Sequence, residues 1–515
     1  MRVPGFSRRD FLATTTAIGA VGAFAQLMPR PAYGASVLNV RMGRDIDILD
    51  PGYMVGGSEI DVQQAVMPTL VEYTYEGGAL GWKPTAYVKE IGHRDPTHID
   101  FTLNSGFQWT NGFGELTAED VKYSFERMKG SDWSGYYDQM TEVQLKDRYS
   151  GTLVMSEPFA PFWLTSLASG TGIILSQKAT EAAGGKYTTQ IPATCGPYLY
   201  EWRPKERIVF TPNPDWNGPK PDFPEVHFIL VEEDKAAELA YEAGELDVTE
   251  ISSATYARYL KEPVPDSTMQ VAGALQYMWM GMNTEHPKLK DIRVRKAIQY
   301  AVDVDSIIAG AYSGAVEKSY GIVCPGLNGK RNASKYSYDP AKARALIAEA
   351  GATGLELELK TMNAQERVLA ATIIQANLQA VGINAKIMPL DPGPFWDMGQ
   401  ESKGDTWKDL QLWIMRYGTS PDPYECFQWF RREQIGVWNW ERWSDDEFEA
   451  LYKEGLVSTD PARRNEIYLR MQEIMDDTGA YVWLDHEPEV FIHRNSVALD
   501  ISPSGNSDFR DFKSV

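Results

Sequence analysis

The chain has 515 residues, of which 43% are hydrophobic, and it carries a formal net charge of −21 at pH 7. This length and apolar content are enough to bury a large core and favour two or three domains over one. The acidic balance disfavours nucleic acid and anionic membrane surfaces as partners, because both would be repelled.

The N-terminus has the features of a twin-arginine (Tat) export signal. The twin arginines of SRRDFL precede an uncharged Ala/Thr/Gly-rich run at 13–27, and Ala32 and Gly34 suit a cleavage site after residue 34. Removal of residues 1–34 deletes four arginines and one aspartate, so the net charge would change from −21 to −24. No other stretch has the roughly 18 apolar residues of a spanning helix, so we expect a soluble periplasmic protein.

Strand and helix patterns alternate along the rest of the chain. The segment HIDFTLNS (98–105) alternates apolar and polar residues, as strands do, and Thr117 opens a helix with a capping box completed by Asp120. A proline-rich stretch at 211–226 is typical of an extended surface connector. This alternation indicates an α/β fold with more than one sheet.

The C-terminal half repeats one pattern for starting helices. Asp-Pro dipeptides at 339–340 and 460–461 each supply an N-cap and a proline at the first helical position, and Ser444 with Glu447 forms a capping box for a helix between them. We expect helices to begin at all three places.

One segment of this half is less regular than its surroundings. MRYGTSPDPYECFQWF (415–430) combines an arginine, two prolines, acids and several aromatic residues, and it follows predicted strands at 383–390 and 409–415. We interpret it as neither a regular helix nor a central strand but as a ligand-binding loop built on a stiff turn at Pro421–Pro423.

Motifs of catalysis and metal binding are missing from the sequence. It has no G-x-S-x-G elbow, no phosphate-binding loop and no dinucleotide fingerprint. HEPEVFIH sets His486 and His493 seven residues apart, and Pro488 prevents the helical turn that a zinc-binding pair needs. Acid pairs such as Glu232 with Glu233 are expected by chance in so acidic a chain. We expect a protein that is not an enzyme, with no metal and no cofactor.

Cysteines and tryptophans give further expectations. Three cysteines cannot form a disulfide framework; Cys324 and Cys426 could pair, and we treat all three as structural. Seven of the fifteen tryptophans fall within 396–443. Indole rings make good pocket walls, and we expect Trp440 and Trp443 to be walls and Trp413 to be core.

Five blocks in order along the chain resemble one family, the extracytoplasmic substrate-binding proteins of ABC importers of the oligopeptide, dipeptide and nickel-chelate type (solute-binding family 5). The most specific is FTLNSGFQWTNGFGELTAEDVKYSFERM. The others are CGPYLYEWRPKERIVFTPNPDW with GELDV, MGMNTEHPKLKDIRVRKAIQYAVDVDSII, YDPAKARALIAEAG and WSDDEFEAL. The resemblance covers nearly the whole chain after residue 34.

The resemblance implies an α/β, two-lobed periplasmic-binding-protein fold of type II, which closes on its ligand by a hinge. Lobe I would have a core of residues 35–76, 191–282 and 489–515 with an extra subdomain at 77–190, and lobe II would cover 283–488. It also implies a monomer that delivers a small-molecule or peptide-like ligand to permease subunits in the inner membrane.

The resemblance also bears on the charge of the ligand. In peptide-binding members a loop W-x-x-D-Y-P-D-P follows a strand of the second lobe, and its first aspartate pairs with the α-ammonium group of the peptide. Aligned on Pro421–Pro423, this chain has Arg416 in place of the tryptophan and Thr419 in place of that aspartate. Threonine cannot give a buried amine a charge-assisted contact, whereas arginine suits carboxylate or phosphate. The alternative is that Arg416 pairs with Asp422 or a neighbour and never meets the ligand.

We therefore expect capture of a small organic solute that is peptide-like, opine-like or an oligosaccharide. A binder of metal chelates or haem with the same fold is one alternative, and an exported glycan hydrolase is another. Each nominated contact could instead be hinge or core packing. The nominated ligand contacts are Ser58, Glu59, Tyr136, Tyr137, Thr171, Arg416, Tyr417, Thr419, Asp422, Asn439, Trp440 and Trp443.

Overall fold

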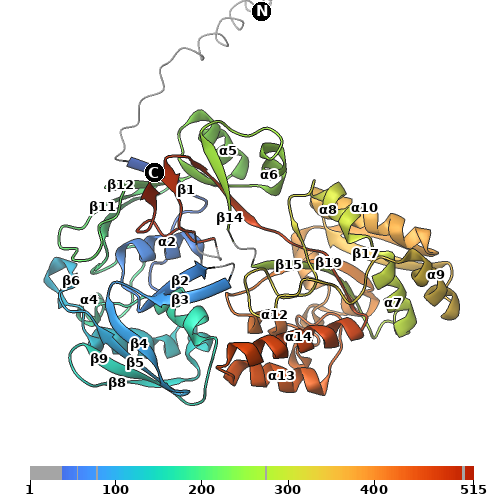
Figure 1. The fold of residues 1–515 in the computed structure, drawn as a ribbon, viewed down its shortest axis with the longest axis horizontal. Helices are drawn as coiled ribbons and strands as arrows, with labels where there is room; N and C mark the ends of the chain where they lie inside the picture. Colours follow the sequence, from blue (N-terminus) through green and yellow to red (C-terminus); the bar gives the residue numbers. More distant parts are fainter. Residues whose placement is uncertain (1–36, 55, 77–78, 273–274, 502–504) are drawn as a thin grey trace, which may run out of the picture. The chain divides into compact units, whose positions relative to one another are not determined.

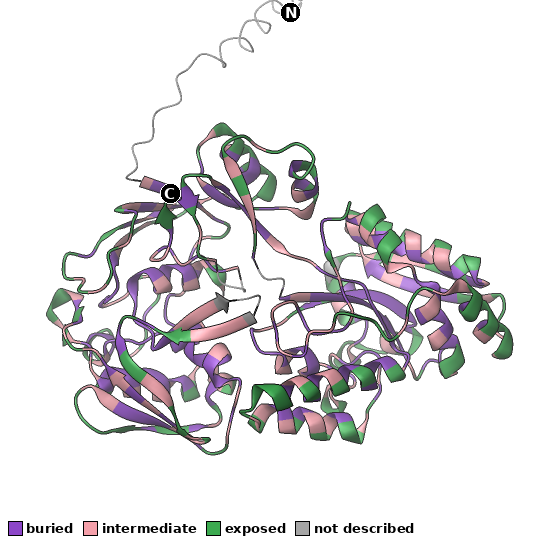
Figure 2. Ribbon diagram, viewed as in Figure 1, coloured by how far each residue is buried: buried purple, intermediate pink, exposed green. Residues whose placement is uncertain are grey.

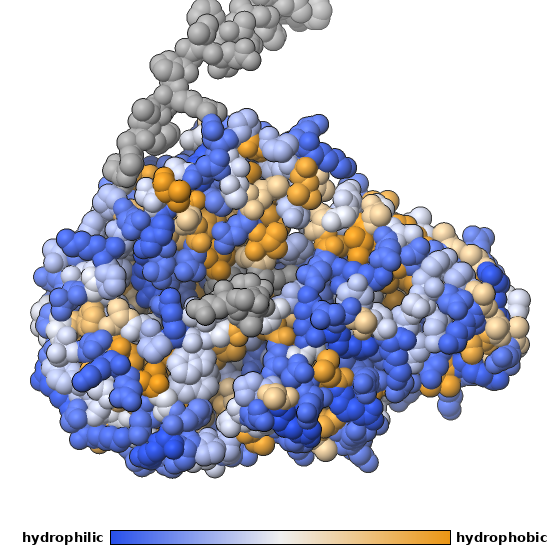
Figure 3. All heavy atoms as spheres, viewed as in Figure 1, coloured by the Kyte–Doolittle hydropathy of each residue, from blue (hydrophilic) through white to orange (hydrophobic). Residues whose placement is uncertain are grey.

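The computed structural model describes residues 37–54, 56–76, 79–272, 275–501 and 505–515. The expected export signal at 1–34 lies outside the described residues. Among the described residues, none of the helices combines the length and the apolar character needed to cross a membrane. The face shown in Figure 3 is mostly hydrophilic, with scattered hydrophobic residues, as the acidic composition leads one to expect.

A seven-stranded sheet forms the framework of lobe I (Figure 1). Strands β1 and β13 pair in parallel at Val40 and Val248, whereas β22 runs antiparallel to both β13 and β14. Helices α2 (Gly57–Val66), α5 (Asp234–Ala243) and α6 (Ser253–Tyr259) belong to this lobe. The strand order is β10 (Tyr198–Arg203), β11 (Arg207–Pro212), β12 (Glu225–Leu230), β1 (Val37–Met42), β13 (Val248–Ile251), β22 (Glu489–Arg494) and β14 (Ser267–Ala272).

A four-stranded antiparallel sheet lies within the expected extra subdomain at 77–190. Its order is β4 (Val88–Asp95), β5 (His98–Leu103), β9 (Ser150–Met155) and β8 (Met140–Leu145), and α3 (Ala118–Glu126) packs on β8. The shorter elements here are β3 (Ala79–Pro84), which pairs with β2 (Val71–Glu76) just before the subdomain, β6 (Gln108–Trp109) with β7 (Gly114–Glu115), α4 (Gln177–Ala182), η1 (Thr110–Gly112), η2 (Arg127–Gly130), η3 (Ser134–Tyr137), η4 (Trp163–Leu167) and η5 (Gly170–Gly172).

A mixed five-stranded sheet forms lobe II, in the order β18 (Ile383–Leu390), β17 (Leu355–Met362), β19 (Leu412–Gly418), β15 (Gln276–Met282) and β20 (Tyr481–Trp483). The pairs β17/β18 and β17/β19 are parallel, and β15 is antiparallel to its neighbours. Our boundary at residue 282 placed β15 in lobe I. Its pairing with β19 and β20 puts it in lobe II instead.

Helices cover both faces of this sheet. One face packs against α7 (Ile292–Ala301), α8 (Val304–Ala311), α9 (Pro340–Glu349) and α10 (Gln365–Ala380). The other packs against α12 (Tyr424–Gln428), α13 (Asp446–Val457) and α14 (Pro461–Asp477). Figure 2 shows buried strands between helices whose outer faces are exposed. The short elements are β16 (Glu317–Lys318), β21 (Asp485–His486), β23 (Val497–Ala498), β24 (Lys513–Ser514), α11 (Pro392–Asp397), η6 (Glu401–Lys403), η7 (Thr406–Asp409) and η8 (Arg432–Gln434).

The chain passes between the two large sheets twice. It leaves lobe I between β14 and β15 and returns between β21 and β22. Strand β21 pairs with β16, whereas β22 joins the seven-stranded sheet three residues later. The segment 487–488 is therefore the return crossing.

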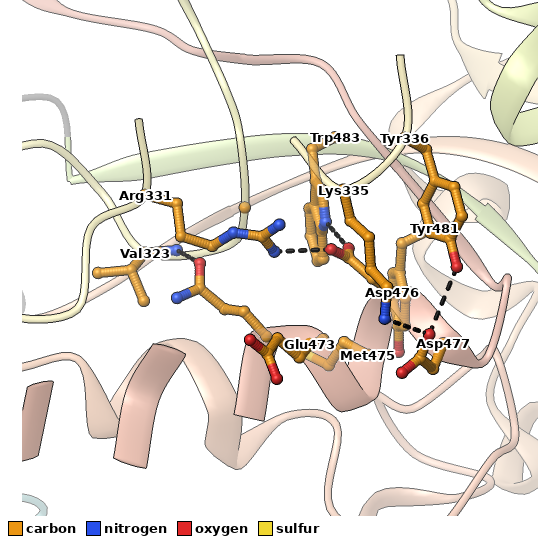
Figure 4. Close-up of polar contacts among 12 residues, drawn as sticks. Val323, Arg331, Lys335, Tyr336, Glu473, Met475, Asp476, Asp477, Tyr481 and Trp483 are labelled. Atoms are coloured by element: carbon orange, nitrogen blue, oxygen red, sulfur yellow. Dashed lines mark hydrogen bonds and ion pairs between the residues drawn. The ribbon is translucent and has the colours of Figure 1, made fainter. Parts of the chain in front are cut away.

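A long loop at 319–339 is held onto the end of α14 (Figure 4). Arg331 Nη1 lies 2.7 Å from Asp476 Oδ2, and the other oxygen of Asp476 accepts a hydrogen bond of 2.8 Å from Trp483 Nε1. Lys335 reaches Asp477 at 2.5 Å. These bonds fix the loop that precedes α9.

Most expected helix starts are confirmed. Helix α9 begins at Pro340, α14 begins at Pro461, and the capping box at the start of α3 is present. Helix α13 differs, because its N-cap is Asp445, whose carboxylate accepts the Phe448 N–H at 2.9 Å. An aspartate accepts this bond as well as the expected Ser444 would.

Candidate ligand-binding site

Strand β19 carries Arg416 and Tyr417, and this corrects our interpretation of segment 415–430. Residues 415–418 lie in the central strand of the five-stranded sheet, and Tyr424–Gln428 is a short helix. Successive side chains of a strand point to opposite faces. Arg416 therefore lies beside Met278, on the face covered by α10, and Tyr417 beside Tyr277, on the face covered by α12.

The Arg416 guanidinium is part of a charged group. Glu487, in the return crossing, places Oε1 2.8 Å from Arg367 Nη2 and Oε2 against Arg416 Nη1. The side chains of Arg367 and Glu487 are 9% and 12% exposed, whereas that of Arg416 is 46% exposed. Arg416 is thus paired and still open to solvent. Its partner is Glu487, not Asp422.

Two further acids lie near Arg416. Burial raises the pKa of Asp485 to about 8, and burial likewise raises the pKa of Glu489 to about 8, although Arg416 opposes both shifts. Neither oxygen of Asp485 has a hydrogen-bond partner among the described residues. Arg367, Arg416 and Glu487 together carry one formal net positive charge, and the raised pKa values disfavour the charged forms of the two further acids.

Ser58 lines a cavity of about 420 Å³ on the lobe I side. Glu489 and Asp61 also line it, so the cavity adjoins the neighbourhood of Arg416. Glu59 follows Ser58 on α2 but is fully buried, paired with Arg44, and accepts the Asp47 N–H at 2.9 Å. Both oxygens of the Glu59 carboxylate therefore already have partners within the protein.

Tyr136, Tyr137 and Thr171 are brought together in lobe I. Tyr137 is buried and donates a hydrogen bond of 2.8 Å to the carbonyl of Thr171, and Ser166 bonds both to Tyr136 and to Thr171. The Tyr136 ring is half-buried; burial and then the charge of Glu425 on α12 raise its pKa. Tyr136 is the member of this group that faces lobe II.

The turn after β19 holds Thr419 and Asp422. The Thr419 N–H donates to the carbonyl of Leu275 at 2.8 Å, while Asp422 is buried and lies 2.7 Å from Arg464. Glu425, which sequence reasoning did not nominate, accepts the Ser420 N–H at 2.8 Å. A carboxylate therefore lies next to Thr419 although residue 419 itself is not an acid.

Asp422 and Arg464 also line a larger cavity of about 620 Å³. Its opposite wall includes Trp82 and Trp163, whose rings stack 3.9 Å apart. Backbone hydrogen bonds join the lobes here, from Leu80 to Gly326 at 3.2 Å and from Ala160 to Leu456 at 2.8 Å.

Asn439, Trp440 and Trp443 lie inside lobe II rather than on an open wall. Asn439 is fully buried and donates to the carbonyls of Phe430 and Trp443, both at 2.9 Å. The indole N–H groups of Trp440 and Trp443 donate to the Val437 carbonyl and to the Tyr481 hydroxyl. Trp413 is core, as expected.

Three half-buried tryptophans of this region surround Tyr417, which is itself buried. Trp396, Trp429 and Trp438 have ring centroids 6.2, 6.4 and 6.1 Å from that of Tyr417. We call these four residues the aromatic platform. The sequence shows that tryptophans are concentrated in residues 396–443, but it does not show which of them remain accessible to solvent.

Histidine and carboxylate groups give little support for bound metal. His486 lies in β21 and His493 in β22, so they share no helix, and burial lowers the pKa of His486 to about 4. Among the described residues, one carboxylate group has metal-like spacing, Glu72 with Asp508 and Asp511. Arg510 lies 3.4 Å from Glu72 and also pairs with Asp508, so it already supplies a positive charge there.

Comparison with known proteins shows to which family the chain belongs. Residues 93–436 match the family described as bacterial extracellular solute-binding proteins, family 5 (middle). The chain belongs to this family. A probable D,D-dipeptide-binding periplasmic protein of Escherichia coli (strain K12) is 26% identical, over 87% of this chain and 88% of its own length. A dipeptide-binding protein of the same organism is also 26% identical, over 80% and 82%.

The fold is shared with solved structures of this class. An ABC transporter substrate-binding protein from Listeria monocytogenes superposes with a TM-score of 0.79 at 20% identity, covering 93% of this chain and 99% of that one. The expected type II α/β fold and the family resemblance are confirmed. As a member of family 5, the chain is a bacterial extracellular solute-binding protein, and the two Escherichia coli relatives are likewise named as binding proteins.

Proposed function

We propose that the protein, exported by the Tat pathway, acts in the periplasm as a monomer that captures a short peptide-like organic acid and delivers it to membrane permease subunits. The observation that carries the proposal is the Arg416 guanidinium. It is 46% exposed and, together with Arg367, shares one carboxylate, that of Glu487. The excess positive charge suits an anionic group on the ligand.

A carboxylate is the group that this arrangement recognises best. A guanidinium presents paired N–H donors that match the two oxygens of a carboxylate, and such bonds are stronger when partly shielded from water. The two relatives named as dipeptide-binding proteins support a peptide-like frame, since a dipeptide ends in a carboxylate. Thr419 offers no negative charge, so the amino end should contribute little to affinity.

The nominated contacts then divide into two sets. We propose that the accessible ones, Ser58, Tyr136, Arg416 and Thr419, contact the ligand, and that the half-buried tryptophans around Tyr417 offer it an aromatic surface. Aromatic faces bind the apolar parts of a ligand at small cost in conformational entropy. The buried ones support these residues from within: Glu59, Tyr137, Thr171, Tyr417, Asp422, Asn439, Trp440 and Trp443.

A thermal-shift screen of the mature protein tests the ligand class. The compounds are L-Ala-L-Ala, D-Ala-D-Ala, their C-terminal amides, their N-acetyl derivatives and neutral oligosaccharides. A ligand at a hundred times its Kd stabilises the fold by about 2.7 kcal/mol. We expect stabilisation by compounds with a free carboxylate and none by the amides. Equal stabilisation by acids and amides, or by oligosaccharides alone, would refute the proposal.

The role of Arg416 needs a matched pair of variants. Arg416→Ala should weaken binding of any carboxylate compound that stabilises the wild type by at least tenfold while leaving the circular dichroism spectrum unchanged. Arg432→Ala is the control, because Arg432 is exposed and paired with Asp446 in lobe II. If both variants bind like the wild type, Arg416 serves the structure only.

A further inference from the structure

We propose that Glu487 is a resident carboxylate, which fills the anion subsite formed by Arg367 and Arg416 until the carboxylate of the ligand displaces it. This inference rests on the proposed function and deepens it. It adds Arg367 to the anion subsite, and it identifies Glu487 as a side chain of the protein itself that competes with the ligand for this subsite.

The geometry of Glu487 is that of a bound anion. Its two oxygens contact two different guanidinium groups, Arg367 at 2.8 Å and Arg416 on the other side. Arg367 comes from α10 and Arg416 from β19, so the two arginines belong to one lobe and hold a fixed spacing. A ligand carboxylate in the same position would satisfy the same donors.

The three side chains differ in how easily they are reached. Arg367 and Glu487 are nearly covered, whereas almost half of the Arg416 side chain faces solvent. A carboxylate arriving from solvent therefore meets Arg416 first. It can bond to the Arg416 guanidinium before Glu487 has left. The two guanidinium groups are therefore never both without a carboxylate partner during the exchange.

Glu487 is placed to move. It lies in the return crossing, between β21, which pairs with β16 of lobe II, and β22, which belongs to the sheet of lobe I. The arginines lie within lobe II. A hinge motion at 487–488 would change the position of Glu487 relative to both arginines, so exchange of carboxylates and motion of the lobes would be linked.

Asp485 supplies a reserve partner. It is fully buried near Arg367 and Arg416, and neither of its oxygens has a hydrogen-bond partner among the described residues. A buried polar group without a partner is costly. If Glu487 moves away before the ligand carboxylate has taken its place, loss of the Asp485 proton to solvent would supply Arg367 with a negative partner in the interval.

Glu487→Gln gives the decisive test, because it keeps the size of the side chain and removes the competing charge. If Glu487 competes with the ligand, this variant binds carboxylate compounds at least tenfold more tightly than the wild type. If Glu487 only orients the arginines, the variant binds them more weakly. The two roles thus predict opposite signs.

The probes are L-Ala-L-Ala and D-Ala-D-Ala by isothermal titration, and sodium acetate by thermal shift as a minimal carboxylate. Glu449→Gln is the control, because Glu449 accepts a bond from the Arg431 guanidinium and one from the Arg432 backbone N–H and is similarly buried, but lies on α13. Its affinities should stay within twofold of the wild type. Glu487→Asp retains the charge but is too short to bridge both arginines, and should also tighten binding, by a smaller factor.

The outcomes separate this inference from the proposed function. If the wild type needs the ligand carboxylate and Arg416 for binding, but Glu487→Gln binds no more tightly, the proposed role of Glu487 is wrong and the proposed function stands. Binding that ignores the carboxylate overturns the proposed function as well. If neither dipeptides nor acetate stabilise Glu487→Gln more than the wild type, the resident-carboxylate proposal fails, whatever the natural ligand is. If Glu487→Gln does not fold, Glu487→Asp decides between the same signs.

Discussion

The carboxylate of Asp422 lies 2.7 Å from Nη2 of Arg464, and both side chains are buried. Arg464 also donates to the Gly455 carbonyl at 3.0 Å and to the Tyr468 hydroxyl at 2.6 Å. The aspartate of the Pro-Asp-Pro turn therefore ties this turn to α13 and α14. The Asp422 carboxylate therefore has a structural role, because it holds the turn that positions the end of β19.

Asp422→Ala should lower the free energy of unfolding by about 3–5 kcal/mol, because it leaves the Arg464 charge buried without its partner. Urea unfolding followed by circular dichroism measures the loss. Asp405→Ala is the control, since its pair with Lys408 is exposed and should contribute no more than about 1 kcal/mol. A loss below about 1 kcal/mol in Asp422→Ala would show that the pair is dispensable.

Stability should fall as the pH rises from 6.5 to 9. Burial raises the pKa of Asp61, Glu441, Asp485 and Glu489 to about 8 each. A carboxyl whose pKa is raised in the folded state binds more protons there than in the unfolded chain. Its stabilising contribution is complete below the ordinary pKa of about 4 and is lost as the pH rises through about 8. We expect a loss of at least about 2 kcal/mol by urea unfolding.

The chosen range avoids the opposing effect of His486. The pKa of this histidine is lowered to about 4, so its contribution is complete above about 6.5 and is lost only at more acidic pH. Glu441→Gln, which removes one of the four carboxyls, should flatten the pH dependence. Stability that increases from pH 6.5 to 9 would contradict the assignment.

All three cysteines should be unreactive in the native protein. Cys195, Cys324 and Cys426 are buried free thiols, and burial raises the pKa of Cys195 and Cys324 above the usual range, which suppresses the reactive thiolate. A chromogenic thiol reagent should find no thiol before unfolding and three afterwards, without added reductant. A count of one after unfolding would show that two of the cysteines are bridged.

Glu425 decides whether the amino end of a ligand matters. We expect free and N-acetylated dipeptides to bind within about threefold of each other, because Thr419 carries no charge and Glu425 is engaged with the Ser420 N–H. Isothermal titration of Glu425→Gln with both compounds completes the test. A tenfold preference for the free amine that disappears in this variant would assign amine recognition to Glu425.

Local signals in the sequence placed many elements correctly. Helices α9 and α14 begin at their Asp-Pro dipeptides, and β18 spans residues 383–390 as predicted. Strand β19 shows the limit, because it begins at Leu412 and continues to Gly418 rather than ending at residue 415. Pairing with β15 extends it, and such pairing between segments at least 130 residues apart in sequence leaves no local pattern.

The candidate site was harder to predict from the sequence than the helices and strands, because its side chains are brought together only by the tertiary structure. The order of blocks in the sequence nominated Arg416 and Tyr417 together, but these two side chains lie on opposite faces of the sheet. Glu487 and Arg367 come from segments far from 415–430 in the sequence, and nothing in their own segments marks them. Trp440 and Trp443 show why composition is ambiguous: an indole suits a core and a pocket wall equally well until its neighbours are known.

The double passage of the chain between the sheets has a mechanical consequence. Strand β1 and the final segment 505–515 both belong to lobe I, where Phe509 packs on Phe210 and Phe228, and the whole five-stranded sheet lies between β14 and β22 in the chain. A pulling force applied at the two ends of the chain is carried first by the seven-stranded sheet. It reaches lobe II only after β22 has been stripped from β13 and β14, so single-molecule stretching should unfold lobe I before lobe II.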